Sequence, residues 1–266
     1  MKVTIIIPSY NPTKKLIKLV SALQKDFNDI LIVDDGSTNE TKKIYEELSN
    51  VKIIYHDVNK GKGEALKTAI KSLKDTDAFI TVDADLQHSP KDVSKVKEEL
   101  LNNDIVLGTR NFNKKNVPFT SKFGNKFSSL VFKIKTGITL KDTQTGLRGI
   151  NIKYKDLCLN TSGSRYEYEM NFLYNLAKNK INFKCIDIAT IYEDNNSGSH
   201  FHAIRDSILI HKWIIPLLIL LIVLIIIIIW DITMKKNIIL FIITFIYFIY
   251  SYKSRERFIL RCQMFD

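Results

Sequence analysis

Two pairs of closely spaced aspartates are the residues whose types and spacing most suggest chemistry. They stand in the segments Asp34-Asp35-Gly36-Ser37 and Asp83-Ala84-Asp85-Leu86-Gln87. The oxygens of Asp83, Asp85 and Gln87 are hard ligands of the kind that Mg²⁺ or Mn²⁺ prefers. Such an ion usually binds substrate phosphates as well, so the pattern predicts a nucleoside diphosphate as the ligand. Each aspartate taken alone has a second interpretation, as a turn or cap residue.

Other polar motifs are less specific. Gly61-Lys62-Gly63 stands at the expected start of a helix, where it could give backbone freedom or contact a phosphate. The sequence lacks a Walker phosphate loop, and three spaced glycines do not follow the first strand, so the ATPase and dinucleotide-binding motifs are excluded. His200, His202 and His211 lack the spacing of a zinc site.

The elements that must position these side chains form a strand–helix alternation over residues 1–110. Apolar runs predict strands at 3–7, 30–33, 51–55, 79–82 and 105–107, and helical periodicity predicts helices at 14–24, 40–48, 63–73 and 91–101. Continuous apolar strands between helices indicate an α/β fold, with a mostly parallel sheet and helices on both faces. Ligands of such sheets bind at the carboxyl ends of the strands, and both aspartate pairs directly follow a strand.

The C-terminal part is strongly apolar. Residues 213–230 carry no charge and have Trp at both ends, which predicts a transmembrane helix, although a buried core helix is the alternative. Residues 238–252 would return as the second helix of a hairpin, or lie as a re-entrant or tilted interfacial helix. Residues 201–212 are expected to form a juxtamembrane amphipathic helix, and residues 253–266 a basic tail. Basic residues at both outer ends favour a membrane-anchored protein whose catalytic domain is in the cytoplasm.

Composition supports a membrane partner. The 266 residues hold 39 Lys and Arg against 28 Asp and Glu, a formal net charge of +11. Residues 121–135 mix lysines with large apolar side chains, as basic amphipathic helices at membrane surfaces do. Nucleic acid is a less economical partner, since the apolar end already places basic charge near anionic lipid. Three scattered cysteines indicate a reducing compartment, and the first apolar run is too short for a signal peptide.

Six segments together resemble family 2 glycosyltransferases with the GT-A nucleotide-diphospho-sugar transferase fold. They are IIIPSYNP (5–12), VDDGSTNET (33–41), NKGKGEAL (59–66), DADLQHSP (83–90), GTRNF (108–112) and DTQTGLRG (142–149). The sequence is most similar to the polyprenyl-phosphate sugar transferase branch, which includes dolichyl-phosphate mannose synthase and bactoprenol glucosyltransferases. The resemblance covers about residues 3–210 and implies a catalytic domain over residues 1–200.

The resemblance also implies roles for individual residues. The nucleotide sugar would be bound by Pro8, Tyr10, Asn11, Asp34, Asp35, Lys62, Asp83, Ala84, Asp85 and His200, although many relatives have Lys or Arg where His200 stands. The divalent cation, Mg²⁺ or Mn²⁺, would be held by Asp83, Asp85 and Gln87. The acceptor would be bound by Arg110, Lys122, Asp142, Gln144, Thr145 and Arg148. Asp83, Asp85, Arg110 and Arg148 would carry catalysis.

The expected function is the inverting transfer of a sugar from a UDP- or GDP-sugar to a polyprenyl phosphate, such as undecaprenyl or dolichyl phosphate, at the cytoplasmic membrane face. One alternative is a family 2 enzyme that glycosylates a sugar or lipid hydroxyl and needs a carboxylate base, for which Asp142, Glu167 and Glu169 are the candidates. The second alternative is a non-catalytic membrane subunit that binds nucleotide sugar. The sequence leaves a homo-oligomer open.

Overall fold

The computed structural model describes residues 1–112, 117–191 and 215–262. The chain divides into two compact units, Met1–His211 and Lys212–Asp266. The expected juxtamembrane helix at 201–212 lies outside the described residues.

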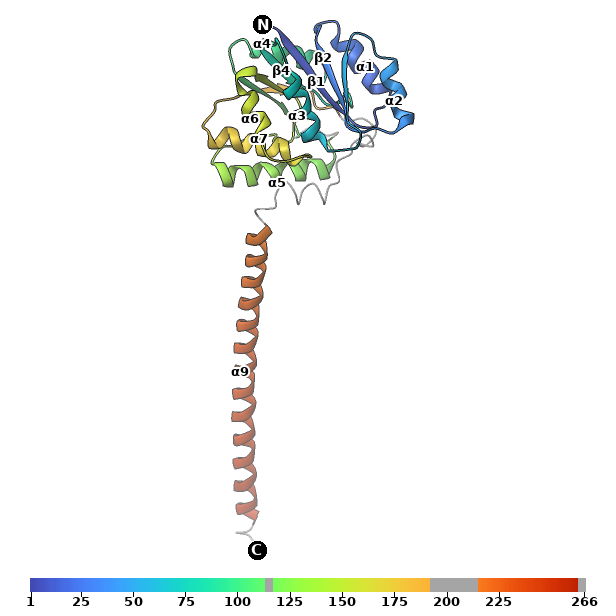
Figure 1. Cartoon of the computed structure of the whole chain (residues 1–266). Coiled ribbons are helices and arrows are strands. Elements are labelled where there is room, and N and C mark those ends of the chain that lie inside the picture. The colour runs from blue at the N-terminus through green and yellow to red at the C-terminus, as the bar shows by residue number, and fades with distance from the viewer. Residues whose placement is uncertain (113–116, 192–214, 263–266) are drawn as a thin grey trace. The chain divides into compact units, whose positions relative to one another are not determined.

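In the described part of the first unit, seven strands form one sheet in the order β3-β2-β1-β4-β6-β5-β7 (Figure 1). The strands are β1 (Val3–Ser9), β2 (Ile30–Asp34), β3 (Lys52–Tyr55), β4 (Ala78–Thr81), β5 (Ile105–Arg110), β6 (Arg148–Asn151) and β7 (Lys184–Ile188). All neighbouring strands are parallel except that β6 runs antiparallel to both β4 and β5. The predicted, mostly parallel α/β sheet is confirmed, and the antiparallel β6 is an addition to it.

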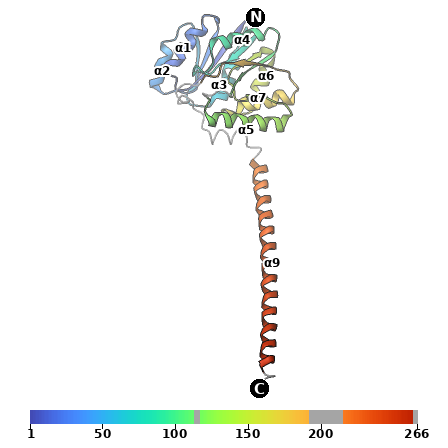
Figure 2. The ribbon, with the colours of Figure 1, turned by 180° about the vertical axis from the view of Figure 1, so that it is seen from behind.

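Helices cover both faces of this sheet, because successive strand residues alternate between two apolar cores. The helices are α1 (Lys14–Leu23), α2 (Asn39–Glu46), α3 (Lys62–Ser72), α4 (Pro90–Glu99), α5 (Phe119–Thr136), α6 (Lys155–Leu159) and α7 (Glu167–Lys178), with a 3₁₀ turn at Ile152–Tyr154. One core joins the sheet to α3, α5, α6 and α7, and the other joins it to α1, α2 and α4. Helices α1 and α2 lie side by side in both views (Figures 1 and 2).

Strand β6 has a consequence for the site. Thr81 of β4 is paired with Arg148, and Arg148 is also paired with Leu107 of β5. The segment that leads into β6, residues 142–147, therefore enters the sheet between the carboxyl ends of two strands that run the other way. It approaches the loops that follow β4 and β5.

The second unit contains α9 (Ile215–Cys262), one continuous helix of 48 residues. The structure has no turn between residues 230 and 238, as the predicted hairpin would require, and the helix continues into the predicted basic tail as far as Cys262. Helical spacing accommodates the polar residues, since Lys235 pairs with Asp231 at 2.8 Å and the Thr233 hydroxyl donates to the Ile229 carbonyl. Along 220–230 the large apolar side chains are exposed.

Two segments, 213–230 and 238–252, were predicted to contact or cross a membrane. Within the part of the chain that the structure describes, no helix meets the length and apolarity needed to cross a membrane. These two predictions are therefore not supported.

Candidate functional site

The loop after β4 carries the two aspartates expected to hold a cation. The Asp85 carboxylate accepts a hydrogen bond from the Gln87 backbone N–H at 3.0 Å, a local turn in which Leu86 adopts a φ of 65°. Nε2 of the buried His88 lies 3.3 Å from Oδ2 of Asp83. Burial and the neighbouring Asp83 carboxylate raise the pKa of Asp85 above its ordinary value. The loop thus holds two close carboxylates in a defined shape.

Gly146 lies directly against this loop, a contact that no local sequence pattern predicts. A Cβ atom at Gly146 would come within 2.2 Å of Oδ2 and 2.5 Å of Oδ1 of Asp83. The Thr81 hydroxyl donates to the Gly146 carbonyl at 2.6 Å, which fastens the segment to the end of β4. Only glycine lets the backbone approach the carboxylate so closely.

Lys62 is the cation beside these carboxylates. Its Nζ lies 2.6 Å from Oδ1 of Asp83 and 3.0 Å from Oε1 of Glu169, which stands in the first turn of α7. Burial opposes the charge of Lys62, but Asp83 and Glu169 raise its pKa above the ordinary value. Burial also works against ionised Asp83, yet Lys62 and His88 hold the pKa of Asp83 well below its ordinary value. The three side chains form one ionic cluster.

The glycines on either side of Lys62 have a packing role. A Cβ at Gly61 would lie 2.5 Å from the Ser164 carbonyl oxygen, and one at Gly63 would lie 2.7 Å from Cβ of Tyr168. Gly61 also has a φ of +100°, a region that side chains disfavour. The Gly-Lys-Gly motif therefore lets the start of α3 pack closely on the start of α7, which brings Lys62 to Glu169.

The other aspartate pair accepts hydrogen bonds from within the protein. Asp35 accepts from the backbone N–H groups of Lys60 and Gly61 at 2.9 and 2.7 Å, and its Oδ1 lies 2.8 Å from Nδ1 of His56. Asp34 accepts from the backbone and hydroxyl of Ser37 and from the Tyr45 hydroxyl. The two buried carboxylates shape the loops around the site, and Asp35 fixes the turn that leads into Lys62.

Arg110 and Asp142 lie at the end of β5, on the expected acceptor side. The Asp142 carboxylate accepts from Nε of Arg110 at 2.8 Å and from Nη2 at 3.1 Å, a two-pronged ion pair. The Asp142 side chain is fully buried, and it also accepts from the Gln144 backbone N–H. The structure thus brings together three of the residues predicted to face the acceptor.

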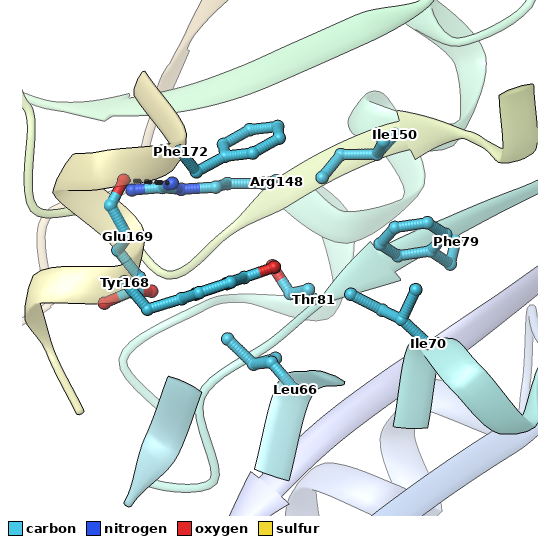
Figure 3. A pocket seen from close by; sticks show the side chains of 9 residues that line it. All are labelled: Leu66, Ile70, Phe79, Thr81, Arg148, Ile150, Tyr168, Glu169 and Phe172. Atoms are coloured by element: carbon cyan, nitrogen blue, oxygen red, sulfur yellow. Dashed lines mark hydrogen bonds between the residues drawn. The ribbon is translucent and has the colours of Figure 1, made fainter. Parts of the chain in front are cut away.

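Arg148 does not face an acceptor surface, contrary to the sequence-based expectation. It is 3% exposed, because β6 lies inside the sheet and α7 covers it. Its Nη1 donates to the Glu169 carbonyl at 2.8 Å and its Nε to the Thr145 carbonyl at 3.0 Å. Figure 3 shows the guanidinium beside the Phe172 ring, in an interior pocket that α3, β4, β6 and α7 line. Arg148 therefore positions Glu169 and Thr145.

The remaining predicted residues divide into structural and accessible ones. Asn11, at a φ of 47°, accepts from the Thr38 backbone N–H and the Thr41 hydroxyl, so it ties the loop after β1 to the start of α2. Pro8 and Thr145 are buried, and the half-buried residues are Tyr10, Ala84, Gln87, Lys122 and Gln144. His200 lies outside the described residues.

The carboxylates proposed as bases are all engaged as acceptors. Asp142 holds Arg110, Glu169 holds Lys62, and Glu167 accepts from the backbone N–H groups of Ser164 and Arg165. Among the described residues, no group of three or more His, Cys, Asp or Glu side chains is placed to hold a metal ion. A cation at this site would therefore need the amide of Gln87 or a ligand oxygen besides Asp83 and Asp85.

Comparison with known proteins identifies the family. Residues 4–155 match the sequence profile of glycosyl transferase family 2. The chain is 35% identical over 215 residues to a UDP-N-acetylglucosamine–dolichyl-phosphate N-acetylglucosaminyltransferase of Methanococcus voltae, covering 71% of this chain and 86% of that protein. It is 37% identical over 145 residues to a dolichol-phosphate mannosyltransferase of Pyrococcus furiosus, covering 50% of this chain and 41% of that protein.

The fold is also found among solved structures. Glucosyl-3-phosphoglycerate synthase of Mycobacterium tuberculosis, in a complex with Mn²⁺ and UDP, superposes with a TM-score of 0.59 at 14% identity, covering 73% of this chain and 72% of that one. Mannosyl-3-phosphoglycerate synthase of Rubrobacter xylanophilus gives a TM-score of 0.60 at 14% identity, covering 78% and 72%. With this GT-A fold and the profile match, the chain belongs to glycosyl transferase family 2 and is a glycosyltransferase.

Proposed function

We propose that this enzyme transfers a sugar from a UDP- or GDP-sugar to a polyprenyl phosphate, with inversion at the anomeric carbon, on the cytoplasmic face of a membrane. The observation that carries the proposal is the cluster of Asp83, Asp85 and Lys62 at the carboxyl end of β4. At this edge of the sheet, the two carboxylates would bind a metal ion and the Lys62 ammonium would bind the diphosphate. The names of the relatives support a polyprenyl phosphate as the acceptor.

The donor set of this loop fits a divalent cation. Asp83, Asp85 and Gln87 would hold Mg²⁺ or Mn²⁺ through oxygen atoms, which both ions prefer. Burial and, after it, the neighbouring Asp83 carboxylate raise the pKa of Asp85, and a cation would offset the repulsion between the two carboxylates. When bound, the ion would stabilise the negative charge of the leaving diphosphate.

The chain's own residues would position both substrates. Lys62 would donate hydrogen bonds to the diphosphate, and Asp35 would keep the turn before Lys62 in place. Arg110, oriented by Asp142, would attract the acceptor phosphate at the end of β5. Positioning and electrostatic attraction account for the acceleration in such a reaction.

A phosphate acceptor suits these carboxylates better than a hydroxyl acceptor. A phosphate is already anionic at neutral pH and needs no base, whereas a hydroxyl must lose a proton during attack. Asp142, Glu167 and Glu169 each accept hydrogen bonds or pair with a cation, so each would have to give up such a contact to take a proton from a hydroxyl.

Helix α5 would rest on the membrane that holds the acceptor. Leu130 and Ile134 are 55% and 65% exposed, and they continue a stripe that starts with the exposed Phe123 and Phe127 at helical spacing. Lys126 and Lys133 are exposed on the same helix. Apolar and basic side chains in this mixture favour the surface of anionic lipid. The exposed apolar side chains of α9 would add to the membrane contact.

The experiment is a transfer assay with the full chain in detergent. Radiolabelled UDP- and GDP-sugars, beginning with UDP-N-acetylglucosamine, are each incubated with Mn²⁺ and a short polyprenyl phosphate. The expected result is label in the organic phase that depends on the phosphate, with no label on the matching polyprenol. Equal labelling of the polyprenol would support the hydroxyl-acceptor alternative. Nucleotide-sugar binding without turnover for every donor would support the non-catalytic alternative.

A further inference from the structure

We infer that in the ligand-free enzyme the Lys62 ammonium pairs with Asp83 in place of a divalent cation. When the cation binds, Glu169 would keep Lys62 beside the site. The inference rests on the proposed metal-bound diphosphate. Its starting point is the position of Nζ of Lys62, 2.6 Å from Asp83 and 3.0 Å from Glu169. One ammonium is thus shared between the expected metal ligand and a second carboxylate.

The ammonium and the cation would compete for one carboxylate. Oδ1 of Asp83 is taken by Lys62, and Oδ2 lies 3.3 Å from the His88 ring. The Gly146 backbone closes another side, since a Cβ there would fall within 2.6 Å of all three carboxyl atoms. A divalent ion held by Asp83 would meet the Lys62 charge at close range, and like charges repel. Binding of the ion therefore requires Lys62 to move.

Glu169 is built to keep Lys62 nearby. The Glu169 side chain is 9% exposed, and its backbone carbonyl accepts the hydrogen bond from the buried Arg148. The Tyr166 ring, 5.8 Å from Nζ, offers the ammonium a further favourable contact. The flexible stem of lysine allows Nζ to turn on a fixed backbone, and its three donors can serve Glu169 and a phosphate together.

Coupling between cation and nucleotide follows from this exchange. Without nucleotide, the cation must displace Lys62 from Asp83 and gains no new partner for it, so binding is weak. With a nucleoside diphosphate present, Lys62 turns to the phosphates while the cation takes Asp83, so each ligand strengthens the other. The exchange would keep the carboxylates from binding free metal in the absence of donor.

The test measures Mn²⁺ binding to the full chain by electron paramagnetic resonance, with and without UDP. Lys62→Met keeps the length of the side chain and removes its charge. Without UDP this variant should bind Mn²⁺ roughly 10- to 100-fold more tightly, because Mn²⁺ no longer has to break the charged hydrogen bond between Lys62 and Asp83. UDP should then strengthen Mn²⁺ binding less than in the wild type. Lys67→Met is the matched control, because Lys67 lies on the same helix and pairs with Glu64.

Glu169→Gln tests whether Glu169 acts by holding Lys62 or only by attracting the cation through its own charge. In the wild-type background it should weaken UDP-free Mn²⁺ binding, because Lys62 then has only Asp83 as an anionic partner. In the Lys62→Met background the same change should have little effect. Lys62→Arg retains the charge and should keep UDP-free Mn²⁺ binding weak. Circular dichroism confirms that each variant folds.

Several outcomes would overturn the exchange. They are unchanged or weaker UDP-free Mn²⁺ binding in Lys62→Met, an equal effect of Glu169→Gln in both backgrounds, or no Mn²⁺ binding with UDP present. The result is distinguishable from failure of the proposed function. If Lys62→Met and Glu169→Gln change Mn²⁺ binding as expected but no donor yields a lipid product, the exchange is supported and the proposed acceptor is wrong. If lipid product forms but these variants do not change Mn²⁺ binding, the proposed function is supported and the exchange is wrong.

Discussion

Residues of one type have different roles around this site, and their partners explain the difference. Asp34 and Asp35 are buried and surrounded by donors from Ser37, Tyr45, His56 and the turn before α3. Asp83 and Asp85 stand close together, with Lys62 as the cation on Asp83. A carboxylate that accepts several hydrogen bonds from neighbouring loops shapes those loops, whereas two close carboxylates attract cations.

Asp85 should be required for transfer and not for folding. Asp85→Asn removes a charged metal ligand without changing side-chain size, and in the structure Asp85 accepts only from the nearby Gln87 backbone among the hydrogen bonds described. We expect transfer to fall roughly 10- to 150-fold, as the loss of one interaction with a charged group, worth about 1.5–3 kcal/mol, implies. Thermal unfolding should be nearly unchanged. The measurements are initial rates with Mn²⁺ and a melting curve.

A matched loss should follow chelation of the wild-type enzyme with EDTA, and Mn²⁺ should restore its activity. Full activity in both Asp85→Asn and EDTA-treated enzyme would contradict a metal role for this loop.

Gly146→Ala should damage the site through Asp83. The added methyl group would lie 2.2 Å from a carboxylate oxygen, so Asp83 or the segment entering β6 must shift. We expect Mn²⁺ binding in the presence of UDP to weaken by roughly 10-fold or more, since misplacing a charged hydrogen-bonding group costs about 1.5 kcal/mol or more. Calorimetry measures this effect.

Gly124→Ala is the matched control for this change. Gly124 is in helix α5, and an added Cβ meets nothing within 4 Å. Alanine there should stabilise the helix by up to about 1 kcal/mol and leave Mn²⁺ binding as it is. Equal Mn²⁺ binding by the two alanine variants would show that the close approach of Gly146 to Asp83 is not needed for metal binding.

At the scale of elements, β6 determines how the two halves of the site meet. Its antiparallel insertion between β4 and β5 buries Arg148 and brings residues 142–147 against the loops after those strands. Helix α5 follows β5 and packs on α7 through Phe132 and Tyr174, whose rings stack at 5.4 Å. One face of α5 is thus fixed, and the face with Leu130 and Ile134 is exposed.

Acidic residues on that exposed face should weaken membrane binding. In Leu130→Asp/Ile134→Asp, two exposed apolar side chains become anionic, so contact with anionic lipid loses apolar area and gains repulsion. We expect less binding to vesicles with phosphatidylserine in flotation assays and slower transfer to polyprenyl phosphate in those vesicles. Transfer to a short acceptor in detergent should change little. Leu101→Asp, at an equally exposed leucine after α4, is the control and should bind vesicles as the wild type does.

The sequence predicted these elements unevenly, and particular residues show why. Five apolar strands, the helices between them and the aspartates at the strand ends follow from local periodicity and were confirmed. Arg148 was misjudged because its burial depends on a strand order that no local pattern reveals. The approach of Gly146 to Asp83, and of Glu169 to Lys62 over 107 positions, depends on packing between distant segments. The hairpin turn expected between residues 230 and 238 is absent from α9, where Lys235 pairs with Asp231 at helical spacing.

At the scale of the whole molecule, two units with different surfaces share one chain. Met1–His211 has two apolar cores on either side of its sheet, while the described part of Lys212–Asp266 is a helix with exposed apolar side chains. An apolar surface of that extent favours lipid over water. The first unit thus contains the described chemistry, and the second would concentrate it at a membrane.

Removal of the second unit should therefore lower membrane affinity and preserve nucleotide binding. A chain ending at His211 keeps both cores and every described residue of the site, so we expect UDP with Mn²⁺ to bind within about threefold of the full chain. The full chain should stay with membranes after a high-salt wash, because salt screens charges and not apolar contact. Release of the full chain into the high-salt supernatant would contradict this role. Fractionation and calorimetry are the measurements.

The segment 142–148 has one more consequence, for how this enzyme tolerates sequence change. Within seven residues, Asp142 orients Arg110, Gly146 abuts Asp83, and Arg148 holds the carbonyl of Glu169. Adding or removing a single residue there would change the spacing between these three contacts, so they could not all be kept. Diversification of substrate preference by insertion or deletion would thus have to occur elsewhere, and this stretch would change by substitution alone.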